Sequence, residues 1–441
     1  MEPSIYRLRQ RDILTICVLA LLCLGMIMVQ SAAMNVTGKT AWQWNPLGIK
    51  QLGFCFVGIA AFFIVGKQDY AWIARSGGSV LRHPVTWLLG LTVVLNVLVL
   101  VPHVGIEKNG ARRWLPIGIT QLQPSELAKW AVVIFLAWWL TRRNNKIDKF
   151  WRGFVPTLIP IGAICLLIVI QDFGTAALIA ICALTMLLAG RVKLWHLAAI
   201  IPPALGAAAW FIMSKEYRWK RMTAFLDPWA NPEREGYHMI QSLLSFSTGG
   251  VPGKGLGNGI QKLGYLPEDT TDFIFAVVCE ELGLFGALLT VALYLGLLYV
   301  AWQVVKQKRD DFGRLLAFGI GSMVGLQATI NIAVATVSVP TKGLSLPLVS
   351  AGGSGLVITC AALGLLYSIS KYRHPAEADI KGSLPILSAG RGDADIKGSD
   401  PFMSGDAFVS GATTPFDLIE PEERAAAAPL SRTPTTEAAL V

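Results

Sequence analysis

Carboxylates gather where a long polar segment of this chain meets an apolar run of membrane length. Glu268, Asp269 and Asp272 close the polar segment, and the apolar run that follows still contains Glu280 and Glu281. Ionisable side chains at or inside a lipid bilayer are costly, and by default they indicate a functional site. We therefore expect either proton-transfer chemistry or transport at this point of the chain.

Helix geometry separates these acids into two sets. Asp272 lies at the expected N-terminus of a helix, where the helix dipole stabilises an anion. Glu280 lies roughly 12 Å deeper at 1.5 Å per residue, and Glu281 points to nearly the opposite face. Asp272 is thus best placed to take a proton from a substrate at the membrane surface, with a simple helix N-cap as the alternative. Glu280 and Glu281 are expected to be buried partners of cations such as Lys129 or Lys342.

Two further segments combine charged side chains at the start of apolar runs. Arg112, Arg113 and Trp114 follow an Asn-Gly turn and present two cations and an indole at the interface, either for a ligand or for interfacial anchoring. Glu126 and Lys129 stand at i, i+3, which puts them on one helix face where they can pair. A buried structural pair is the alternative to a ligand site there.

The segment 340–355 connects two apolar runs and contains paired prolines and glycines. These residues break helices, and irregular backbone at membrane depth requires a cavity lined by protein. Lys342 supplies a cation near that expected cavity, and Ser350 lies in the same segment.

Two short motifs imitate nucleotide-binding signatures. The glycine-rich run 249–259 has Gly255 where a Walker phosphate loop requires Ser or Thr, and no strand precedes it. A flexible hinge, or backbone amides that approach a lipid phosphate, fits this run better. Asp172 begins an Asp-Phe-Gly tripeptide without any kinase context, and we expect it to cap the helix that starts near Phe173.

Composition defines the class of protein that must position these groups. The chain has 441 residues, of which 53% are hydrophobic and 15% charged, against about 25% charged in soluble domains. Recurring apolar runs predict an all-α polytopic membrane protein with about ten transmembrane helices. The predicted spans are 13–33, 47–66, 84–102, 122–141, 154–170, 173–190, 194–213, 273–304, 315–337 and 345–370.

Basic residues predict the orientation of these spans. They concentrate before the first span and in every second connection, which the positive-inside rule makes cytoplasmic. Much of the net charge of +9 is thereby explained by topology, which argues against nucleic-acid binding. The basic residues concerned are Arg7, Arg9, Arg11, Lys67, Arg75, Arg82, Arg142, Arg143, Lys146, Lys149, Arg152, Arg191, Lys193, Lys306, Lys308, Arg309 and Arg314.

This orientation divides the chain into three parts. Residues 1–12 form a cytoplasmic N-terminus, and 13–372 form the ten-helix membrane domain. Within that domain, 214–271 is a large extracytoplasmic loop between helices seven and eight. The tail 373–441 is rich in Ala, Gly, Pro, Ser and Thr, so we expect it to be cytoplasmic and disordered.

Taken together, the motifs resemble the SEDS family (shape, elongation, division and sporulation), the membrane glycosyltransferases of peptidoglycan synthesis. The resemblance covers about residues 10–372 and is closer to the division branch than to the elongation branch. Two positions depart from the family pattern: Gln171 replaces a usual proline, and Ala351 stands where an aromatic residue is common. The motifs that carry the resemblance are 110–114, 123–126, 257–263, 266–275, 280–283 and 340–354.

The resemblance implies polymerisation of lipid II at the outer face of the bacterial cytoplasmic membrane, at the division septum. Asp272 matches the family's essential outer-loop aspartate, the proposed general base, which would deprotonate the acceptor sugar 4-hydroxyl. That oxygen attacks the anomeric carbon of the growing lipid-linked glycan strand with inversion, and undecaprenyl pyrophosphate leaves. Arg113, Lys262 and Lys342 are the candidates for neutralising the pyrophosphate, and Trp114 for packing on a sugar or the prenyl chain.

The remaining substrate-binding candidates are Glu126, Lys129, Glu268 and Ser350. The implied partner is a single-span class B penicillin-binding protein, the transpeptidase, together with other divisome membrane proteins. No cofactor and no fixed metal site is expected, because the outer loop lacks an Asp-x-Asp pair, while assistance by a divalent cation stays open.

A lipid II flippase is the competing function from a different class, since ten helices with buried Glu and Lys also suit translocation. Within the same family, the chain could be an elongation-type polymerase. A scaffold that recruits the transpeptidase is compatible with either function.

Overall fold

The computed structural model describes residues 9–33, 45–75, 79–108, 110–118, 120–142 and 147–372. The predicted disordered tail at 373–441 and most of the predicted N-terminal segment lie outside the described residues.

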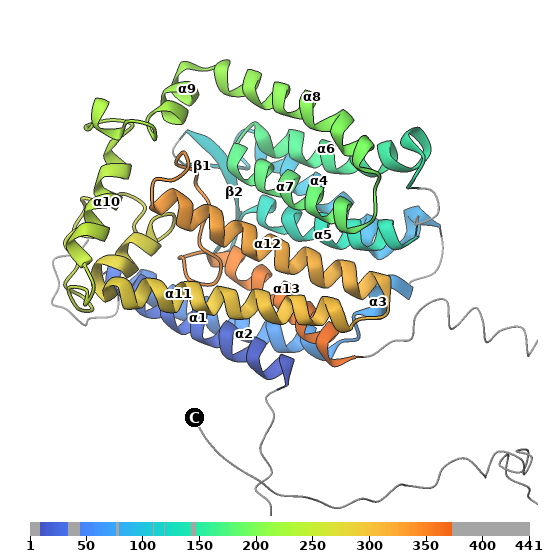
Figure 1. Cartoon of the computed structure of the whole chain (residues 1–441), viewed down its shortest axis with the longest axis horizontal. Coiled ribbons are helices and arrows are strands. Elements are labelled where there is room, and N and C mark those ends of the chain that lie inside the picture. Colours follow the sequence, from blue (N-terminus) through green and yellow to red (C-terminus); the bar gives the residue numbers. More distant parts are fainter. Residues whose placement is uncertain are drawn as a thin grey trace, which may run out of the picture. The chain divides into compact units, whose positions relative to one another are not determined.

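Within these described residues, ten long helices account for the ten predicted spans, which confirms an all-α polytopic membrane protein (Figure 1). Seven of them are long and apolar enough to cross a membrane, when α6 is taken together with the preceding turn as Phe150–Val169. Two others are shorter apolar helices, and α5 carries a buried ion pair in its first turns. They are α1 (Gln10–Ala33), α2 (Pro46–Lys67), α4 (Pro84–Leu100), α5 (Pro124–Arg142), α6 (Val155–Val169), α7 (Phe173–Ala189), α8 (Leu194–Met213), α11 (Ile274–Gln307), α12 (Asp311–Ala335) and α13 (Gly353–Lys371).

Small residues allow α2 and α13 to approach each other closely. A Cβ added at Gly364 would lie 2.5 Å from the carbonyl oxygen of Phe62, and one added at Gly58 would lie 2.9 Å from Leu356. Backbones that come this close gain dispersion contacts, which lipid-embedded helices need because lipid offers no hydrophobic driving force between them.

Because successive helices alternate in direction, the connections α4–α5, α6–α7, α8–α11 and α12–α13 meet at one end of the bundle (Figure 1). We call this the cavity end, for the cavity described below. The opposite end contains the short helices α3 (Ala71–Arg75), η2 (Val80–Arg82) and η3 (Phe150–Phe154). Aromatic side chains exposed at a lipid–water interface are typical of membrane proteins. Exposed tryptophans of this kind at the opposite end are Trp72, Trp87, Trp151 and Trp195.

A small sheet between α4 and α5 was not predicted. Strands β1 (Ile106–Lys108), β2 (Ala111–Ile117) and β3 (Thr120–Leu122) form a three-stranded antiparallel sheet in that order. Gly110 and Gly118, both at positive φ, lie in the two tight turns, where glycine relieves the steric strain of the left-handed region. The sheet holds the predicted Arg-Arg-Trp motif on its central strand.

The predicted loop 214–271 is partly helical rather than irregular throughout. It contains α9 (Glu216–Thr223), η4 (Pro228–Ala230) and α10 (Tyr237–Gly249). Helix α10 packs on the bundle: the rings of Phe246 and Phe275 lie 6.0 Å apart, and Ser242 Oγ donates to the Ala335 carbonyl at 2.6 Å.

Two predicted spans are interrupted where prolines or residues at positive φ break the helix. Helix α13 begins at Gly353 rather than at 345, because Pro340 and Pro347 have no backbone donor and Leu348 adopts a positive φ of 66°. Residues 336–352 therefore form an irregular connection, as the paired prolines and glycines predicted. Helix α11 has 34 residues and a non-helical break at Gly283 (φ 60°, ψ −153°), so the long apolar run does not continue as one regular helix.

Candidate active site

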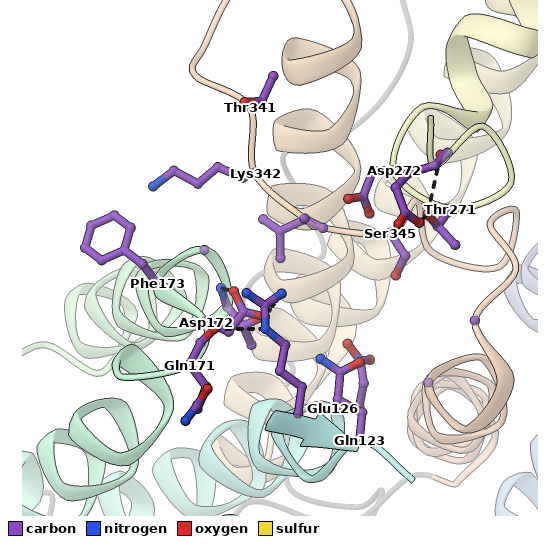
Figure 2. A pocket seen from close by; sticks show the side chains of 18 of the residues that line it. Gln123, Glu126, Gln171, Asp172, Phe173, Thr271, Asp272, Thr341, Lys342 and Ser345 are labelled. Carbon is purple, nitrogen blue, oxygen red and sulfur yellow. Dashed lines mark hydrogen bonds and ion pairs between the residues drawn. The ribbon is translucent and has the colours of Figure 1, made fainter. Parts of the chain in front are cut away.

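A cavity of about 880 Å³ lies among the four connections at the cavity end. It is comparable with the ~300–1,000 Å³ of small-molecule sites. Figure 2 shows Glu126, Asp172, Lys342 and Asp272 around it, each from a different element. The main polar and aromatic side chains that line it are Arg113, Trp114, Gln123, Glu126, Gln171, Asp172, Phe173, Arg218, Arg221, His238, Glu268, Asp272 and Lys342.

Asp272 does not cap α11. The N-cap position is Phe273, and no side chain caps this helix, so the alternative reading of Asp272 as a helix N-cap is wrong. The backbone carbonyl of Asp272 accepts a hydrogen bond from Asn331 Nδ2 at 2.8 Å. Among the described residues, no donor bonds its half-buried carboxylate.

The pKa of Asp272 is raised from 3.8 to about 7, first because burial removes water from the carboxylate, and second because Glu268 and Asp172 are negatively charged neighbours. Arg113 and Arg221 oppose this rise. A carboxyl group with a pKa near neutrality exchanges protons efficiently at physiological pH, so Asp272 is suited to general base chemistry.

Gly343 brings Asp272 and Arg113 close to the same stretch of backbone. A Cβ added at Gly343 would lie 3.2 Å from Asp272 Oδ2 and 3.7 Å from Arg113 Nη1. The carboxylate and the guanidinium group therefore both face the connection between α12 and α13.

Arg113 is held in place at the N-terminus of α7. Its Nε donates to the Gln171 carbonyl at 2.8 Å, and its Nη1 lies 3.9 Å from Asp172 Oδ2. Asp172 accepts from Thr175 N at 3.1 Å and from Thr175 Oγ1 at 2.8 Å, which confirms the predicted helix cap. One carboxylate thus caps α7 and holds a cation at the cavity wall.

Lys342 provides a second cation on the other side of this helix end. Its Nζ lies 3.8 Å from the centroid of the Phe173 ring, toward which it points in Figure 2. Burial lowers the pKa of Lys342 from 10.5 to about 8, Asp172 opposes this change, and Arg221 adds to it. The ammonium group therefore stays protonated near neutral pH, so Arg113 and Lys342 place two cations beside the N-terminus of α7, where a polyanion could bind.

Glu126 and Lys129 form the predicted ion pair, with Lys129 Nζ 2.9 Å from Glu126 Oε2. Glu126 lines the cavity, whereas Lys129 is fully buried and also donates to Gln327 Oε1 at 2.7 Å. The pair therefore presents its carboxylate to the cavity and hides its ammonium group beneath.

The predicted partners of Glu280 and Glu281 are wrong. Glu280 pairs with Lys254 at 2.9 Å, and Glu281 pairs with Lys262, not with Lys129 or Lys342. Lys254 lies in the glycine-rich run 249–259, and Lys262 follows that run closely. Spacing along the chain could not reveal these partners, because the segment folds back on the first turns of α11. Lys262 is fully buried and does not line the cavity, so the structure does not bring this pyrophosphate candidate to the site.

The glycine-rich run 249–259 follows the same fold-back and is anchored rather than a hinge. Backbone amides approach an anion, as expected, but the anions are the chain's own carboxylates. Gly257 N donates to Glu281 at 3.1 Å and Ile260 N to Glu280 at 2.8 Å. A Cβ at Gly259 would lie 3.0 Å from Glu281 Oε1, which explains why small residues are used here.

The remaining predicted residues divide between the cavity and its supports. Trp114 and Glu268 line the cavity. Ser350 is buried and does not line it; its Oγ donates to the Thr271 carbonyl at 2.5 Å and accepts from Leu346 N at 2.7 Å.

Sequence reasoning missed Arg218 and Arg221 of α9 and His238 of α10, which line the cavity. The i, i+3 spacing of the two arginines on one helix face was the available signal, but 214–271 was predicted to be a loop. Among the residues that the structure describes, no group of three or more His, Cys, Asp or Glu could hold a metal ion. The expectation of no fixed metal or cofactor stays a prediction.

The fold and the cavity together define a polytopic membrane protein. One end of its helix bundle carries a carboxyl group with a pKa near neutrality and several cations. The FtsW/RodA/SpoVE family of cell cycle proteins matches residues 11–375, and the chain belongs to this family. This assignment confirms the resemblance to the SEDS family.

Known relatives support the division branch. The chain is 41% identical over 360 residues to the probable peptidoglycan glycosyltransferase FtsW of Nitrosococcus halophilus (strain Nc4), covering 79% of this chain and 89% of that protein. It is 40% identical over 373 residues to the probable peptidoglycan glycosyltransferase FtsW of Thioalkalivibrio sulfidiphilus (strain HL-EbGR7), covering 83% and 91%.

Solved structures share the fold. A structure of a peptidoglycan synthase complex, described as coordinating polymerization and crosslinking, contains a chain with a TM-score of 0.65 at 28% identity, covering 81% of this chain and 96% of that one. The rod shape determining protein RodA of Thermus thermophilus has a TM-score of 0.59 at 27% identity, covering 82% and 96%.

Proposed function

We propose that this protein polymerises lipid II into peptidoglycan glycan strands at the outer face of the bacterial cytoplasmic membrane during cell division. The names of its FtsW relatives support this activity. The observation that carries the proposal is the position of Asp272, whose pKa of about 7 suits a base, in one cavity with the cations Arg113 and Lys342.

In this reaction Asp272 accepts the proton of the acceptor sugar 4-hydroxyl. The hydroxyl oxygen forms a bond to the anomeric carbon of the lipid-linked strand from the face opposite the pyrophosphate. The bond from that carbon to the pyrophosphate oxygen breaks, undecaprenyl pyrophosphate leaves, and the configuration inverts. A positioned base contributes roughly 10²–10⁴-fold to such a step.

The leaving pyrophosphate gains negative charge as the bond to the anomeric carbon breaks, so it needs fixed cations. Arg113 and Lys342 flank the N-terminus of α7, and Arg218 and Arg221 of α9 line the same cavity. Trp114 offers an aromatic face to a sugar or to the prenyl chain.

We place the cavity end outside the cell and both termini in the cytoplasm. The connections at the opposite end are rich in Lys and Arg, which the positive-inside rule favours on the cytoplasmic side. The partner we propose is a class B penicillin-binding protein, working at the division septum with other divisome proteins. A solved complex that couples polymerization with crosslinking supports this pairing.

The distribution of buried charge favours the enzyme over a flippase. A transporter typically places its key charges near the bilayer midplane. In the described part of the chain, the buried Asp, Glu and Lys residues all lie within about two helical turns of the cavity end. They are Glu126, Lys129, Asp172, Lys262, Glu280 and Glu281.

The test uses the purified protein with its transpeptidase partner and fluorescent lipid II. Asp272→Asn removes the base and should reduce strand synthesis by roughly 10²-fold or more. Asp269→Asn is the matched control, because Asp269 lies in the same segment but does not line the cavity. The proposal fails if the wild type makes no glycan strands, or if Asp272→Asn makes them at the wild-type rate. Translocation of lipid II across vesicles without polymerisation would instead support the flippase.

A further inference from the structure

One face of α12 carries two buried amide side chains, Gln327 and Asn331. They are four residues apart and therefore lie one above the other on the helix. Only 4% of Gln327 and 1% of Asn331 is exposed. Amides are costly in an apolar membrane core unless their hydrogen bonds are made, so the partners of these two groups are informative.

Gln327 connects two walls of the cavity. Its Oε1 accepts from Lys129 Nζ at 2.7 Å, and Lys129 in turn pairs with Glu126, which faces the cavity. Its Nε2 donates to the Ser345 carbonyl at 2.8 Å. Gln327 thereby holds α5 and the connection between α12 and α13 in one arrangement.

Asn331 connects the next two walls with a single amino group. Its Nδ2 donates to the Leu344 carbonyl at 2.6 Å and to the Asp272 carbonyl at 2.8 Å. Its Oδ1 is buried and has no partner among the described residues. Asn331 therefore contributes through its two donated bonds. They link the backbone of Asp272 to the backbone of Leu344, two residues after Lys342.

Other hydrogen bonds also join the segment before α11 to the connection between α12 and α13, but they hold residues that precede Asp272. Ser350 Oγ donates to the Thr271 carbonyl, and Ala351 N donates to the Thr270 carbonyl. These bonds fix the chain before Asp272, whereas α11 becomes regular only after Phe273. Asn331 acts at the residue that bears the carboxylate.

We propose that Gln327 and Asn331 are positioning residues, which set the separations among Asp272, Lys342 and the Glu126–Lys129 pair from one rigid helix. This inference rests on the proposed function, because it explains how the proposed base is held. Sites supported by helices are more exact than sites on loops, and a displacement of about 1 Å can cost ~10²-fold in rate. The alternative is that the two amides only satisfy loop carbonyls and stabilise the fold.

The first experiment replaces the donors of Asn331. Asn331→Leu keeps the branched side-chain shape and removes both bonds, whereas Asn331→Ser keeps a shorter donor that cannot reach both carbonyls. In Asn331→Leu we expect the kcat of lipid II polymerisation to fall at least ~10-fold, with a smaller change in KM. Asn331→Ser should give an intermediate loss. Asn96→Leu is the matched control, because Asn96 is a buried membrane-helix amide that donates to Thr92 within its own helix.

The second readout needs no activity. The pH dependence of carbodiimide labelling at Asp272, followed by peptide mass spectrometry, reports when its carboxyl group is protonated. Release of the segment should admit water, so labelling of Asn331→Leu should end at a lower pH than in the wild type. The charged groups that face Asp272 stay the same in every variant: Glu268, Asp172, Arg113 and Arg221.

The outcomes separate the inference from the proposed function. A shifted labelling curve and a reduced kcat in the Asn331 variants, with Asn96→Leu unchanged, support positioning. Wild-type labelling and wild-type kcat overturn it, and Asn331→Ser decides the matter if Asn331→Leu does not fold. A wild type without polymerase activity overturns the proposed function, while the labelling curves still test the positioning of Asp272.

Discussion

Two sets of acids at the same end of the bundle have opposite surroundings. Glu280 and Glu281 are completely buried, and each carboxylate accepts hydrogen bonds from a lysine and from at least one backbone amide. Asp272, a few residues earlier in the chain, is half-buried, and its carboxylate has no hydrogen-bond donor among the described residues. The position along the bundle therefore does not separate the anchoring acids Glu280 and Glu281 from the proposed base Asp272.

The two sets of acids differ in the hydrogen-bond donors that surround their carboxylates. A buried carboxylate whose hydrogen bonds are all made is fixed by its partners, and it contributes to the fold through them. A desolvated carboxylate without donors has a raised pKa and can take up a proton. The first set anchors the glycine-rich segment that leads to Asp272, and the second is available to a substrate.

The largest effect is expected when the buried ion pair of Glu281 and Lys262 is broken. Glu281→Leu leaves Lys262 buried without its carboxylate, which should lower the free energy of unfolding by about 3–5 kcal/mol. The measurement is reversible unfolding in mixed detergent micelles. The double variant Lys262→Met/Glu281→Leu should recover most of the loss, because an apolar pair needs no compensation. A single variant as stable as the wild type would remove the structural role of this pair.

The opposite effect is expected at Asp272. Its pKa in the folded state, about 7, lies above the ordinary 3.8, so the folded state binds more protons than the unfolded state between these values. The stability of the wild type should therefore fall as the pH rises from about 4 to about 7, and stay low above it. Asp272→Asn lacks this fall and should be more stable at about pH 8, by at most ~4 kcal/mol.

The same pair of proteins supplies the internal control for this prediction. Near pH 4 the carboxyl group and the amide are both neutral in the folded state, so the two unfolding free energies should converge. A constant difference at all pH values would mean that the ionisation of Asp272 does not oppose folding.

The ten helices were predictable because hydrocarbon thickness demands runs of about 20 apolar residues, and such runs are visible without any partner. The pair Glu126–Lys129 and the cap at Asp172 were predictable for a related reason, since both depend on contacts within one helix turn. The break before α13 was visible in Pro340 and Pro347.

What could not be predicted depends on contacts between distant segments. Lys262 looked like a cavity cation until the fold-back of its segment buried it on Glu281. Gln327 and Asn331 carry no charge and read as ordinary polar residues of an apolar helix, because their partners come from other elements. The small sheet was missed since its strands of three and seven residues are too short for a clear alternating pattern.

A smaller perturbation tests how the surroundings of Asp272 set its pKa. After burial, the negative charge of Glu268 is the largest cause of the raised pKa of Asp272. Glu268→Gln should lower that pKa, and the acidic limb of the rate profile should move to lower pH by up to about one unit. A shift of one unit corresponds to ~1.4 kcal/mol of interaction with the carboxylate. The measurement is the initial rate of strand synthesis from about pH 5 to 9. A limb that moves to higher pH, or does not move, would contradict this cause.

The smallest effect compares one substitution in the two regions. Ala at Gly343 would put its Cβ 3.2 Å from Asp272 Oδ2, so the carboxylate must shift by a few tenths of an ångström. We expect a several-fold loss in kcat, roughly, with little change in the unfolding free energy. Gly253, on the anchored segment, has a φ of +77°, and its Cβ would lie 2.3 Å from the Glu281 carbonyl oxygen. Gly253→Ala should therefore destabilise the fold by more than about 1 kcal/mol.

These two variants test whether the anchored glycine-rich run 249–259 and the connection 336–352 at the cavity have separate roles. Rates of strand synthesis and unfolding free energies are measured for both in the same micelles. If Gly343→Ala destabilises as much as Gly253→Ala, then the connection around Lys342 also maintains the fold, and Asp272 is held by a single cooperative unit. If the two effects separate, the saturated acids maintain the fold while the unsaturated acid stays adjustable, because only the anchored segment is locked by backbone strain and buried charge.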